Sequence, residues 1–270
     1  MQKLRKIIQT TVFIGMFLIP LFNLLEIYFI KGTFISMDIG SLGIADPVMI
    51  FQAVLSGMGA AGVLFTSILL PLLLVIFLGR VWCSWACPYT LILQWAEKIP
   101  FLKKRLAANK AKMAKGAKVF AWRYLIFIGF FGLVGIAGVP ILHLFAPPAV
   151  LSTQALLLIK TFTLSVEILF IMIILVVDLF FAYRFTCRYL CPTGTCLSLF
   201  QNRQIGMHID YAGDCIHCQA CIKKCPMGLD PTGTDINLSK EAASRLCYNC
   251  GECIDVCPDK TKPLTWKFGK

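Results

Sequence analysis

Charged side chains are scarce in this sequence, and so are histidines. Charged residues make up 15% of the 270 residues and hydrophobic residues 58%. A soluble domain carries about a quarter charged residues, so this composition excludes a water-soluble globule, and it is too apolar for a disordered chain. Of the three histidines, only His143 lies in a long apolar stretch. A haem held by two histidines within the membrane is therefore excluded.

Long apolar stretches are what the sequence has instead. Crossing a bilayer takes about 20 mostly apolar residues, and four stretches meet this length, at residues 7–30, 60–78, 124–145 and 164–183. The first follows a basic N-terminal segment, as the apolar core of a secretory signal does. Its apolar run is longer than a signal core and no small-residue cleavage site follows it, so we expect a retained helix.

Basic residues are unevenly distributed around these stretches. Of the 26 Lys and Arg, 24 lie before the first stretch, between the second and third, or after the fourth. The two remaining loops contain only Lys31 and Lys160. Membrane proteins keep positive charge on the cytoplasmic side, so both termini are predicted to be cytoplasmic in a multi-pass protein of the bacterial inner membrane. The net charge of +12 is thus interpreted as a membrane signal, with no nucleic-acid partner.

One pattern occurs twice, as GRVWCSWACP at 79–88 and YRFTCRYLCP at 183–192. Each copy follows an even-numbered apolar stretch at its cytoplasmic end, which indicates two related helix pairs. Within a copy the two cysteines share one helical face, and the proline favours an end of the helix at the second cysteine. Arg80 and Arg184, which precede the cysteines, are interpreted as anchors to lipid headgroups.

The cysteines of the two copies would lie close together if the repeats meet about a pseudo-two-fold axis. Three roles are open for such a group: holding a metal as a third redox or metal site, forming redox-active disulfides, or packing as buried thiols. The residues concerned are Cys83, Cys87, Cys187 and Cys191.

Two copies of the ferredoxin run C-x2-C-x2-C-x3-C-P follow near the C-terminus. In such a run three thiolates bind one iron–sulfur cube, and the fourth, before proline, closes the other cube. Zinc ribbons, the alternative, use two pairs of ligands rather than evenly spaced quartets. The spacing therefore predicts two [4Fe–4S] clusters, one on Cys215, Cys218, Cys221 and Cys257, the other on Cys247, Cys250, Cys253 and Cys225.

Ionisable residues inside apolar stretches are functional candidates, because placing them in lipid is costly. Glu26, His143 and Glu167 lie near the outer ends of the first, third and fourth stretches. Oxidising a quinol releases two protons with two electrons, and a Glu or His side chain can accept a proton. These three residues are candidates for a quinol site. The alternative is that each lies at the membrane interface or forms a structural pair.

Four helices, Cys83-Ser-Trp-Ala-Cys-Pro88, Cys187-Arg-Tyr-Leu-Cys-Pro192 and the two ferredoxin runs together resemble the NapH family. That family comprises membrane quinol dehydrogenase components of periplasmic nitrate reductase systems. The same core looks like the C-terminal half of NosR, like MauN and like CcoG. The resemblance covers essentially the whole chain. It implies electron flow from quinol to a partner iron–sulfur protein, and onward to a periplasmic reductase.

The predicted fold class is an all-α membrane domain, residues 1–184, followed by a cytoplasmic α+β ferredoxin-like domain with two clusters, residues 185–270. The membrane domain comprises four transmembrane helices as two repeated pairs. The predicted function is quinol oxidation with electron transfer through iron–sulfur centres. Two alternatives stay open. One is a maturation or reactivation factor that uses cytoplasmic electrons to reduce a metal or disulfide at the Cys-x3-Cys-Pro cysteines. The other is a passive membrane anchor for a peripheral iron–sulfur subunit.

Overall fold

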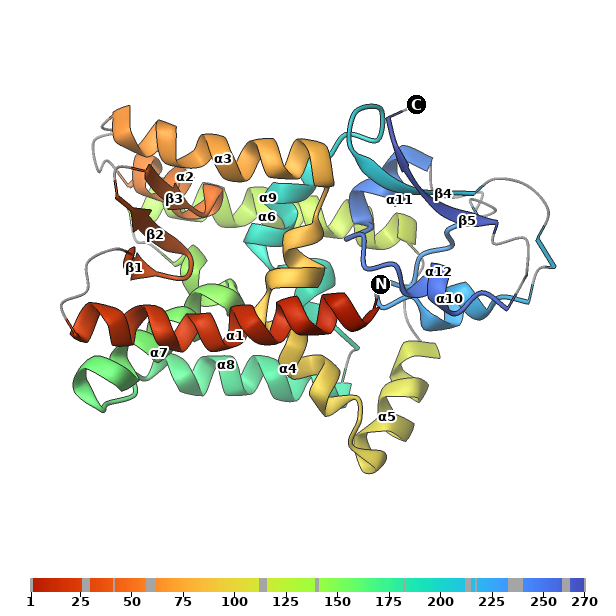
Figure 1. Ribbon diagram of the computed structural model, residues 1–270, viewed down its shortest axis with the longest axis horizontal. Coiled ribbons are helices and arrows are strands. Elements are labelled where there is room, and N and C mark those ends of the chain that lie inside the picture. The colour runs from red at the N-terminus through yellow and green to blue at the C-terminus, as the bar shows by residue number, and fades with distance from the viewer. Residues whose placement is uncertain are drawn as a thin grey trace.

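Long helices that run roughly side by side form one part of the molecule, and a smaller mixed part packs against one end of them (Figure 1). The N-terminus lies where the two parts meet. This computed structural model describes residues 2–25, 30–40, 42–56, 62–111, 116–138, 141–181, 183–211, 215–216, 218–232, 240–258 and 263–269.

The long helices correspond to the four apolar stretches. They are α1 (Gln2–Leu24), α3 (Gly62–Leu78), α6 (Gly116–Ala137) and α8 (Glu167–Val176), which continues as the π-helical turns η3 (Val177–Phe181). Among the described residues, α1 alone is both long and apolar enough to cross a membrane. Shorter apolar stretches lie within α3 and α6, at Thr66–Leu78 and Ala121–Ile136.

Four further helices pack against these, and each begins with proline. Proline suits the first helical turn because its missing N–H would have no partner there. These helices are α2 (Pro47–Leu55), α4 (Pro88–Ala96), α7 (Pro147–Thr161) and α9 (Pro192–Phe200). They meet in two pairs, α2 with α9 and α4 with α7. A further helix, α5 (Pro100–Ala111), leaves the bundle after α4, and a 3-10 turn, η2 (Leu142–Phe145), precedes α7.

A small antiparallel sheet lies between α1 and α3 and departs from the predicted all-α domain. Its strands are β1 (Ile30–Thr33), β2 (Ser36–Ile39) and β3 (Leu42–Ala45), in that order. Thr33 pairs with Ser36, and Ile39 pairs with Leu42, so both connections are tight turns. In the first turn, Phe34 is buried and its backbone N–H donates to Ser152 Oγ of α7, at 3.0 Å. The sheet is therefore tied into the bundle.

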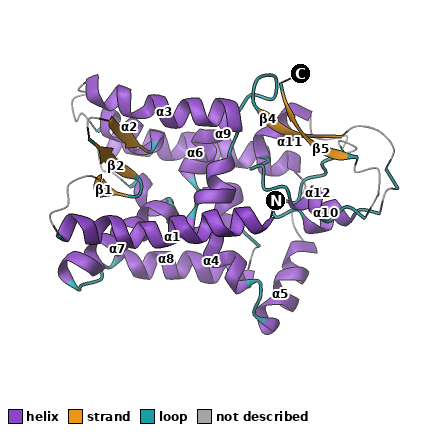
Figure 2. Cartoon of the chain, in the orientation of Figure 1, coloured by secondary structure: helices purple, strands orange, loops and turns teal. Residues whose placement is uncertain are grey.

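The smaller part combines helices with a two-stranded sheet (Figure 2). Strands β4 (Met207–Tyr211) and β5 (Leu264–Phe268) are antiparallel, with Met207 opposite Phe268. Between them lie the helices α10 (Ala220–Lys224), α11 (Lys240–Leu246) and α12 (Glu252–Asp255). This mixture of short helices and strands matches the α+β composition predicted for the ferredoxin-like region.

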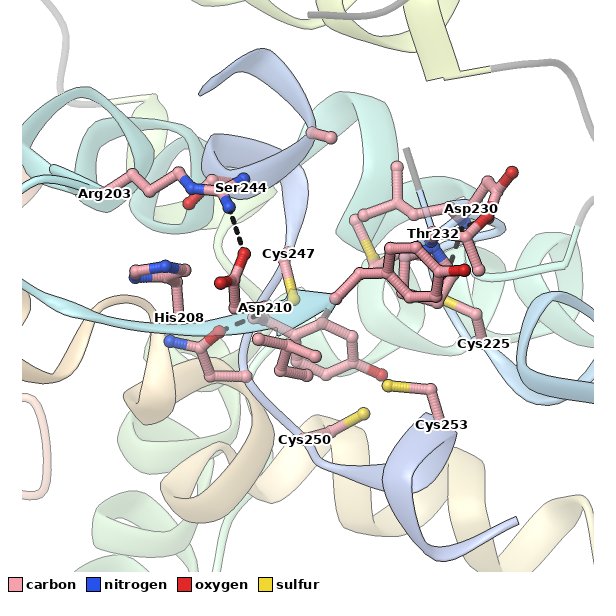
Figure 3. A pocket seen from close by; sticks show the side chains of 18 residues that line it. Arg203, His208, Asp210, Cys225, Asp230, Thr232, Ser244, Cys247, Cys250 and Cys253 are labelled. Atoms are coloured by element: carbon pink, nitrogen blue, oxygen red, sulfur yellow. Dashed lines mark hydrogen bonds and ion pairs between the residues drawn. The ribbon is translucent and has the colours of Figure 1, made fainter. Parts of the chain in front are cut away.

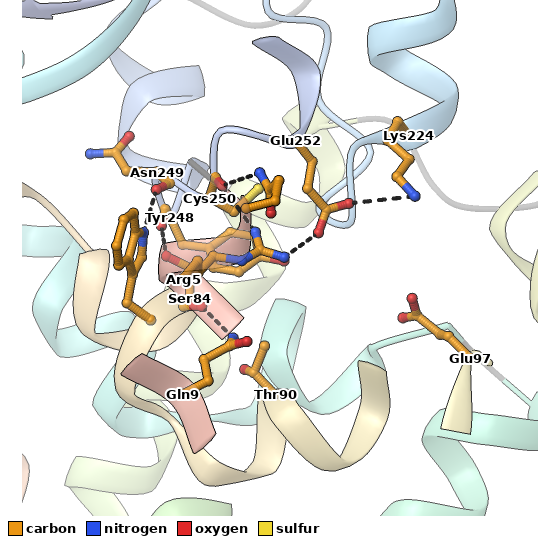
Figure 4. A network of polar contacts seen from close by, with 12 residues as sticks. Arg5, Gln9, Ser84, Thr90, Glu97, Lys224, Tyr248, Asn249, Cys250 and Glu252 are labelled. Carbon is orange, nitrogen blue, oxygen red and sulfur yellow. Dashed lines mark hydrogen bonds and ion pairs between the residues drawn. The ribbon is translucent and has the colours of Figure 1, made fainter. Parts of the chain in front are cut away.

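Polar contacts join the two parts, and most of them reach the loop that carries the second ferredoxin run (Figure 4). Arg5 of α1 donates to the Cys250 carbonyl at 2.9 Å and forms an ion pair with Glu252 at 2.6 Å. Ser84 Oγ donates to the Tyr248 carbonyl at 2.5 Å. Because these groups are buried and hydrogen-bonded, the loop is held in a fixed position against the helical bundle.

Candidate iron–sulfur centres

One cavity of the smaller part is lined by four cysteines, and they are the four grouped by spacing for the first cluster. Three come from the first ferredoxin run and one from the end of the second run; they are Cys215, Cys218, Cys221 and Cys257. Gln219, just after Cys218, has a left-handed backbone with φ of +58°. This residue turns the chain between Cys218 and Cys221.

A second cavity is lined by the other quartet, Cys225, Cys247, Cys250 and Cys253 (Figure 3). Cys225 belongs to the first run, so the fourth cysteine of each run lines the cavity of the other. Two left-handed residues, Asn249 and Gly251, flank Cys250 and turn the loop around the cavity. The backbone N–H of Leu229 donates to Cys225 Sγ at 3.4 Å, a contact that favours a thiolate.

Burial controls the protonation of these thiols in the absence of iron. It raises the pKa of the Cys247 thiol to about 12 and that of Cys250 to about 11. Both residues therefore stay protonated at neutral pH unless a cation compensates the thiolate. Iron does this when it binds, because the ligand is the thiolate and binding releases the proton.

The four Cys-x3-Cys-Pro cysteines line a third cavity, at the boundary between the bundle and the smaller part. They are Cys83, Cys87, Cys187 and Cys191. Each motif forms a π-helical turn, η1 (Trp82–Ala86) or η4 (Thr186–Leu190). The Cys87 N–H donates to the Trp82 carbonyl at 3.0 Å, and the Cys191 N–H to the Thr186 carbonyl at 2.8 Å. As the repeat predicted, both helices end at the second cysteine, where the backbone becomes extended.

Helix N-termini converge on this third cavity. Its wall includes first-turn residues of α4 (Tyr89), of α7 (Pro147 and Pro148) and of α9 (Thr193 and Gly194). The N-terminal end of a helix carries partial positive charge, although the two prolines that begin α7 supply no N–H group. Three such ends around one group of thiols provide an environment that favours a negatively charged occupant.

Two buried arginines add to this positive environment. Arg80 and Arg123 are 2% and 0% exposed, so the interpretation of Arg80 as a lipid anchor is wrong, as it is for Arg184, which is 2% exposed. The Nε of Arg123 donates to Thr195 Oγ1 at 2.8 Å, but its Nη1 and Nη2 are buried without a hydrogen-bond partner in the described part of the chain. A Cβ added to Gly194 would lie 3.1 Å from Arg123 Nη2 and 3.8 Å from Cys191 Sγ.

A buried guanidinium with unpaired donors is costly unless an acceptor lies beside it. A cluster held by four thiolates carries net negative charge and sulfur acceptors, so the residues around the third cavity fit such a group. No three His, Cys, Asp or Glu side chains among the residues described are arranged to hold a single metal ion.

The three cysteine-lined cavities are neighbours in a row. Asp230 and Thr232 line both ferredoxin cavities. Met227 and Tyr248 line both the second ferredoxin cavity and the Cys-x3-Cys-Pro cavity. Neither Arg123 nor the pair Met227 and Tyr248 was singled out by the sequence analysis. Arg123 counts there as one more cytoplasmic charge, and no local pattern marks Met227 or Tyr248.

The candidate quinol residues lie elsewhere. His143 of η2 and Glu167 of α8 contact each other, with 3.1 Å between Nε2 and Oε1, and Gln154 donates to the other oxygen of Glu167 at 3.2 Å. Neither residue is among those that line the cysteine cavities. Glu26 lies outside the described residues. Two of the three candidates are therefore brought together, as a pair near the start of α8.

Two family models match the chain. The model described as "4Fe-4S binding domain" matches residues 60–108 and 164–207, which contain the two Cys-x3-Cys-Pro repeats. The model described as "4Fe-4S dicluster domain" matches residues 206–258, which contain the two ferredoxin runs. Together with the fold, these matches define a helix-rich protein with 4Fe–4S ferredoxin domains.

Relatives of known name agree with this class. The chain is 26% identical over 276 residues to the ferredoxin-type protein NapH of Escherichia coli, covering 98% of this chain and 90% of that protein. It is 26% identical over 251 residues to the methylamine utilization ferredoxin-type protein MauN of Methylorubrum extorquens, covering 89% and 81%. An uncharacterized protein of Methanocaldococcus jannaschii is 28% identical over 262 residues, covering 95% and 84%.

No solved structure matches the chain. The resemblance drawn from the motifs is confirmed: the chain is a homologue of ferredoxin-type proteins that include NapH and MauN.

Proposed function

We propose that this protein is an inner-membrane electron carrier that oxidises quinol and passes the electrons, through iron–sulfur centres, toward a partner iron–sulfur protein and a periplasmic reductase. One observation carries the proposal. Three cavities, each lined by four cysteines, lie in a row and share lining residues. A single storage or structural cluster has no need of such a row, whereas electron transfer does, because an electron moves between adjacent centres.

The proposed ligands are the cysteines that line the cavities. One [4Fe–4S] cluster would be held by Cys215, Cys218, Cys221 and Cys257, a second by Cys247, Cys250, Cys253 and Cys225, and a third centre by Cys83, Cys87, Cys187 and Cys191. Each cluster would supply one-electron transfer. The protein's own residues set the environment of the third centre, because buried Arg80 and Arg123 and three helix N-termini favour negative charge there.

Membrane insertion explains the exposed surface of the bundle. Large apolar side chains lie exposed on the long helices, among them Leu69 and Phe77 of α3, Leu125 and Ile128 of α6, and Ile173 of α8. Large exposed apolar side chains in such number are typical of a surface that contacts a membrane or another protein. We therefore assign α1, α3, α6 and the continuous α8–η3 segment to the membrane, with both termini in the cytoplasm, in agreement with the distribution of basic residues.

A third centre would lie at the boundary between the two parts, next to the second ferredoxin cluster. Tyr248 of the smaller part lines both adjoining cavities and is hydrogen-bonded twice to the bundle: its carbonyl accepts from Ser84, and its hydroxyl accepts from Arg184 Nη1 at 3.2 Å. Buried and paired groups of this kind hold the spacing between two centres constant. A fixed spacing is what an electron-transfer route requires.

The experiment uses the full chain, purified anaerobically in lipid nanodiscs with reconstituted clusters. Decylubiquinol and dithionite are added in separate samples, and cluster reduction is followed by electron paramagnetic resonance. We expect both reagents to reduce the clusters. The double variant Cys87→Ala/Cys191→Ala is expected to lose reduction by decylubiquinol and to keep reduction of the ferredoxin clusters by dithionite.

Cys196→Ala is the matched control, because Cys196 is a buried thiol that lines none of the three cavities. It should behave as the unaltered protein. Reduction by dithionite but never by quinol would contradict quinol oxidation. Quinol-driven reduction that survives loss of Cys87 and Cys191 would contradict the route through the third centre.

A further inference from the structure

A fourth cavity, of about 190 Å³, adjoins the Cys-x3-Cys-Pro cavity. The sheet, α3, η1 and α9 form its wall, which includes Phe34, Asp46, Leu74, Trp82, Trp85 and Thr193. Nearly all of the remaining lining is aliphatic or proline. Neither His143 nor Glu167 takes part in it.

The cavity has aromatic walls and one polar end. The rings of Phe34 and Trp82 are stacked, with centroids 5.2 Å apart and planes 14° from parallel. At the polar end, Asp46 Oδ1 accepts from the Val48 N–H at 2.8 Å, and Oδ2 accepts from Thr193 Oγ1 at 2.9 Å. A carboxylate has about four acceptor positions, so Asp46 can accept a further hydrogen bond from a ligand.

One wall of the cavity belongs to the surface that faces lipid. Leu74 lines the cavity and is 47% exposed, and its neighbours on α3, Leu70 and Phe77, are 46% and 54% exposed. A hydrophobic molecule dissolved in the bilayer therefore meets the cavity from the side, beside Leu74, without crossing water.

The other end of the cavity reaches the cysteines. Trp82, Pro148 and Thr193 line both this cavity and the one lined by the four Cys-x3-Cys-Pro thiols. Thr193 follows directly after the Cys191-Pro192 pair, so the residue that hydrogen-bonds Asp46 is also part of the third centre's wall. An occupant of the fourth cavity lies next to that centre.

We propose that this cavity binds the ring of a quinol or quinone, with Asp46 accepting a hydrogen bond from a ring hydroxyl and the stacked aromatic pair covering the ring. A planar, mostly apolar ring with oxygen atoms at its edge matches an apolar, aromatic cavity with one carboxylate. The identity of the occupant rests on the proposed function; the site itself rests on the lining. In this assignment the His143–Glu167 pair is structural.

The test measures binding, not turnover. Full-length protein in nanodiscs is titrated with decylubiquinone, and quenching of tryptophan fluorescence is recorded, since Trp82 and Trp85 lie in the wall. Asp46→Asn should weaken binding about tenfold, because it removes a charged acceptor. Leu74→Trp, which adds bulk on the exposed face of α3, should weaken it about tenfold as well.

Glu167→Gln is the matched control for Asp46→Asn, and its affinity for decylubiquinone should equal that of the unaltered protein. Iron content measured on every variant reports whether the protein remains folded, and Leu74→Trp keeps the test valid if Asp46→Asn fails to fold. Unchanged affinity in Leu74→Trp, or loss of binding in Glu167→Gln, would overturn the assignment.

Two further outcomes separate this site from the proposed function. Quinol-driven cluster reduction that is unaffected by Asp46→Asn and Leu74→Trp would refute the cavity and leave the function standing. Binding that depends on both residues, with no cluster reduction by quinol, would support the cavity and refute the function. Quenching by brominated phospholipid but not by decylubiquinone would identify a bound acyl chain and also overturn the proposal.

Discussion

Arg5 and Glu252 form an ion pair between the first helix and the smaller part, with 2.6 Å between Nη2 and Oε1. The two side chains are 4% and 15% exposed, so the pair is almost fully withdrawn from solvent. Arg5 also donates to the Cys250 carbonyl. The N-terminal end of α1 is thereby fixed to the loop of the second ferredoxin run, two regions that are far apart in the sequence.

Arg5→Ala is expected to destabilise the protein by about 2 to 4 kcal/mol, because it leaves the largely buried Glu252 with only the more distant Lys224, at 4.0 Å, and the Cys250 carbonyl without one donor. The measurement is the temperature at which iron–sulfur absorbance is lost. Lys3→Ala, a change at an exposed position of the same helix, should leave that temperature unchanged. The double variant Arg5→Ala/Glu252→Gln should regain part of the loss, and a double variant less stable than Arg5→Ala would contradict this explanation.

The features that the sequence predicted correctly are those that local chemistry determines. The end of each helical turn before Pro88 and Pro192 and the two ferredoxin runs both depend on residues within a few positions of one another. The burial of Arg80 and Arg184 depends on partners more than 60 residues away, such as Leu246 for Arg80 and Tyr248 for Arg184, and no local pattern indicates them. These arginines were therefore assigned to the lipid headgroups.

The sheet and the short helices were missed for a related reason. Strands β1 to β3 have four residues each, too few for an alternating pattern to stand out, and Phe34 is buried by residues distant in the sequence, among them Ala155 and Trp82. Helix α7 lies in what the sequence indicates as an outer loop. The π-helical form of the Cys-x3-Cys turns has no sequence signature, although the spacing did predict that the cysteines share a face.

The exchange of the fourth cysteine between the two runs gives a direct test of ligand grouping. Cys218→Ala/Cys257→Ala removes two ligands of the same cluster, so one ferredoxin cluster, with about four irons, should remain. Cys218→Ala/Cys225→Ala removes one ligand from each cluster, so both should be lost or severely depleted. Iron and acid-labile sulfide are measured per polypeptide, with Cys196→Ala as the reference. Equal iron content in the two double variants would contradict the grouping.

Arg123 tests the charge around the third centre. Its buried guanidinium favours the more negative, reduced state, so Arg123→Gln is expected to lower the reduction potential of that centre, by on the order of 50 to 100 mV. Redox titration followed by electron paramagnetic resonance measures the shift, and the two ferredoxin centres should move much less. Arg105→Gln, at an exposed position of α5, is the control. An unchanged reduction potential, in a variant with full iron content, would show that the charge of Arg123 does not act on the third centre.

Gly79 precedes Arg80 at the end of α3 and lies against Asn249, the residue just before Cys250 in the second ferredoxin run. Its φ is +68°, and an added Cβ would lie 2.6 Å from Asn249 Nδ2, which donates to the carbonyls of Leu78 and Met207. Gly79→Ala combines a left-handed backbone with this clash, so we expect the free energy of unfolding to fall by about 2 to 3 kcal/mol. The measurement is the temperature at which the cluster absorbance is lost, which should be lower than in the unaltered protein.

Gly135→Ala is the matched control, because Gly135 lies within α6 with no atom within 4 Å of an added Cβ. That variant should be as stable as the unaltered protein or up to about 1 kcal/mol more stable, since alanine favours the helix. If the two variants lost the same stability, the close contact between Gly79 and Asn249 would not be what requires glycine at this position.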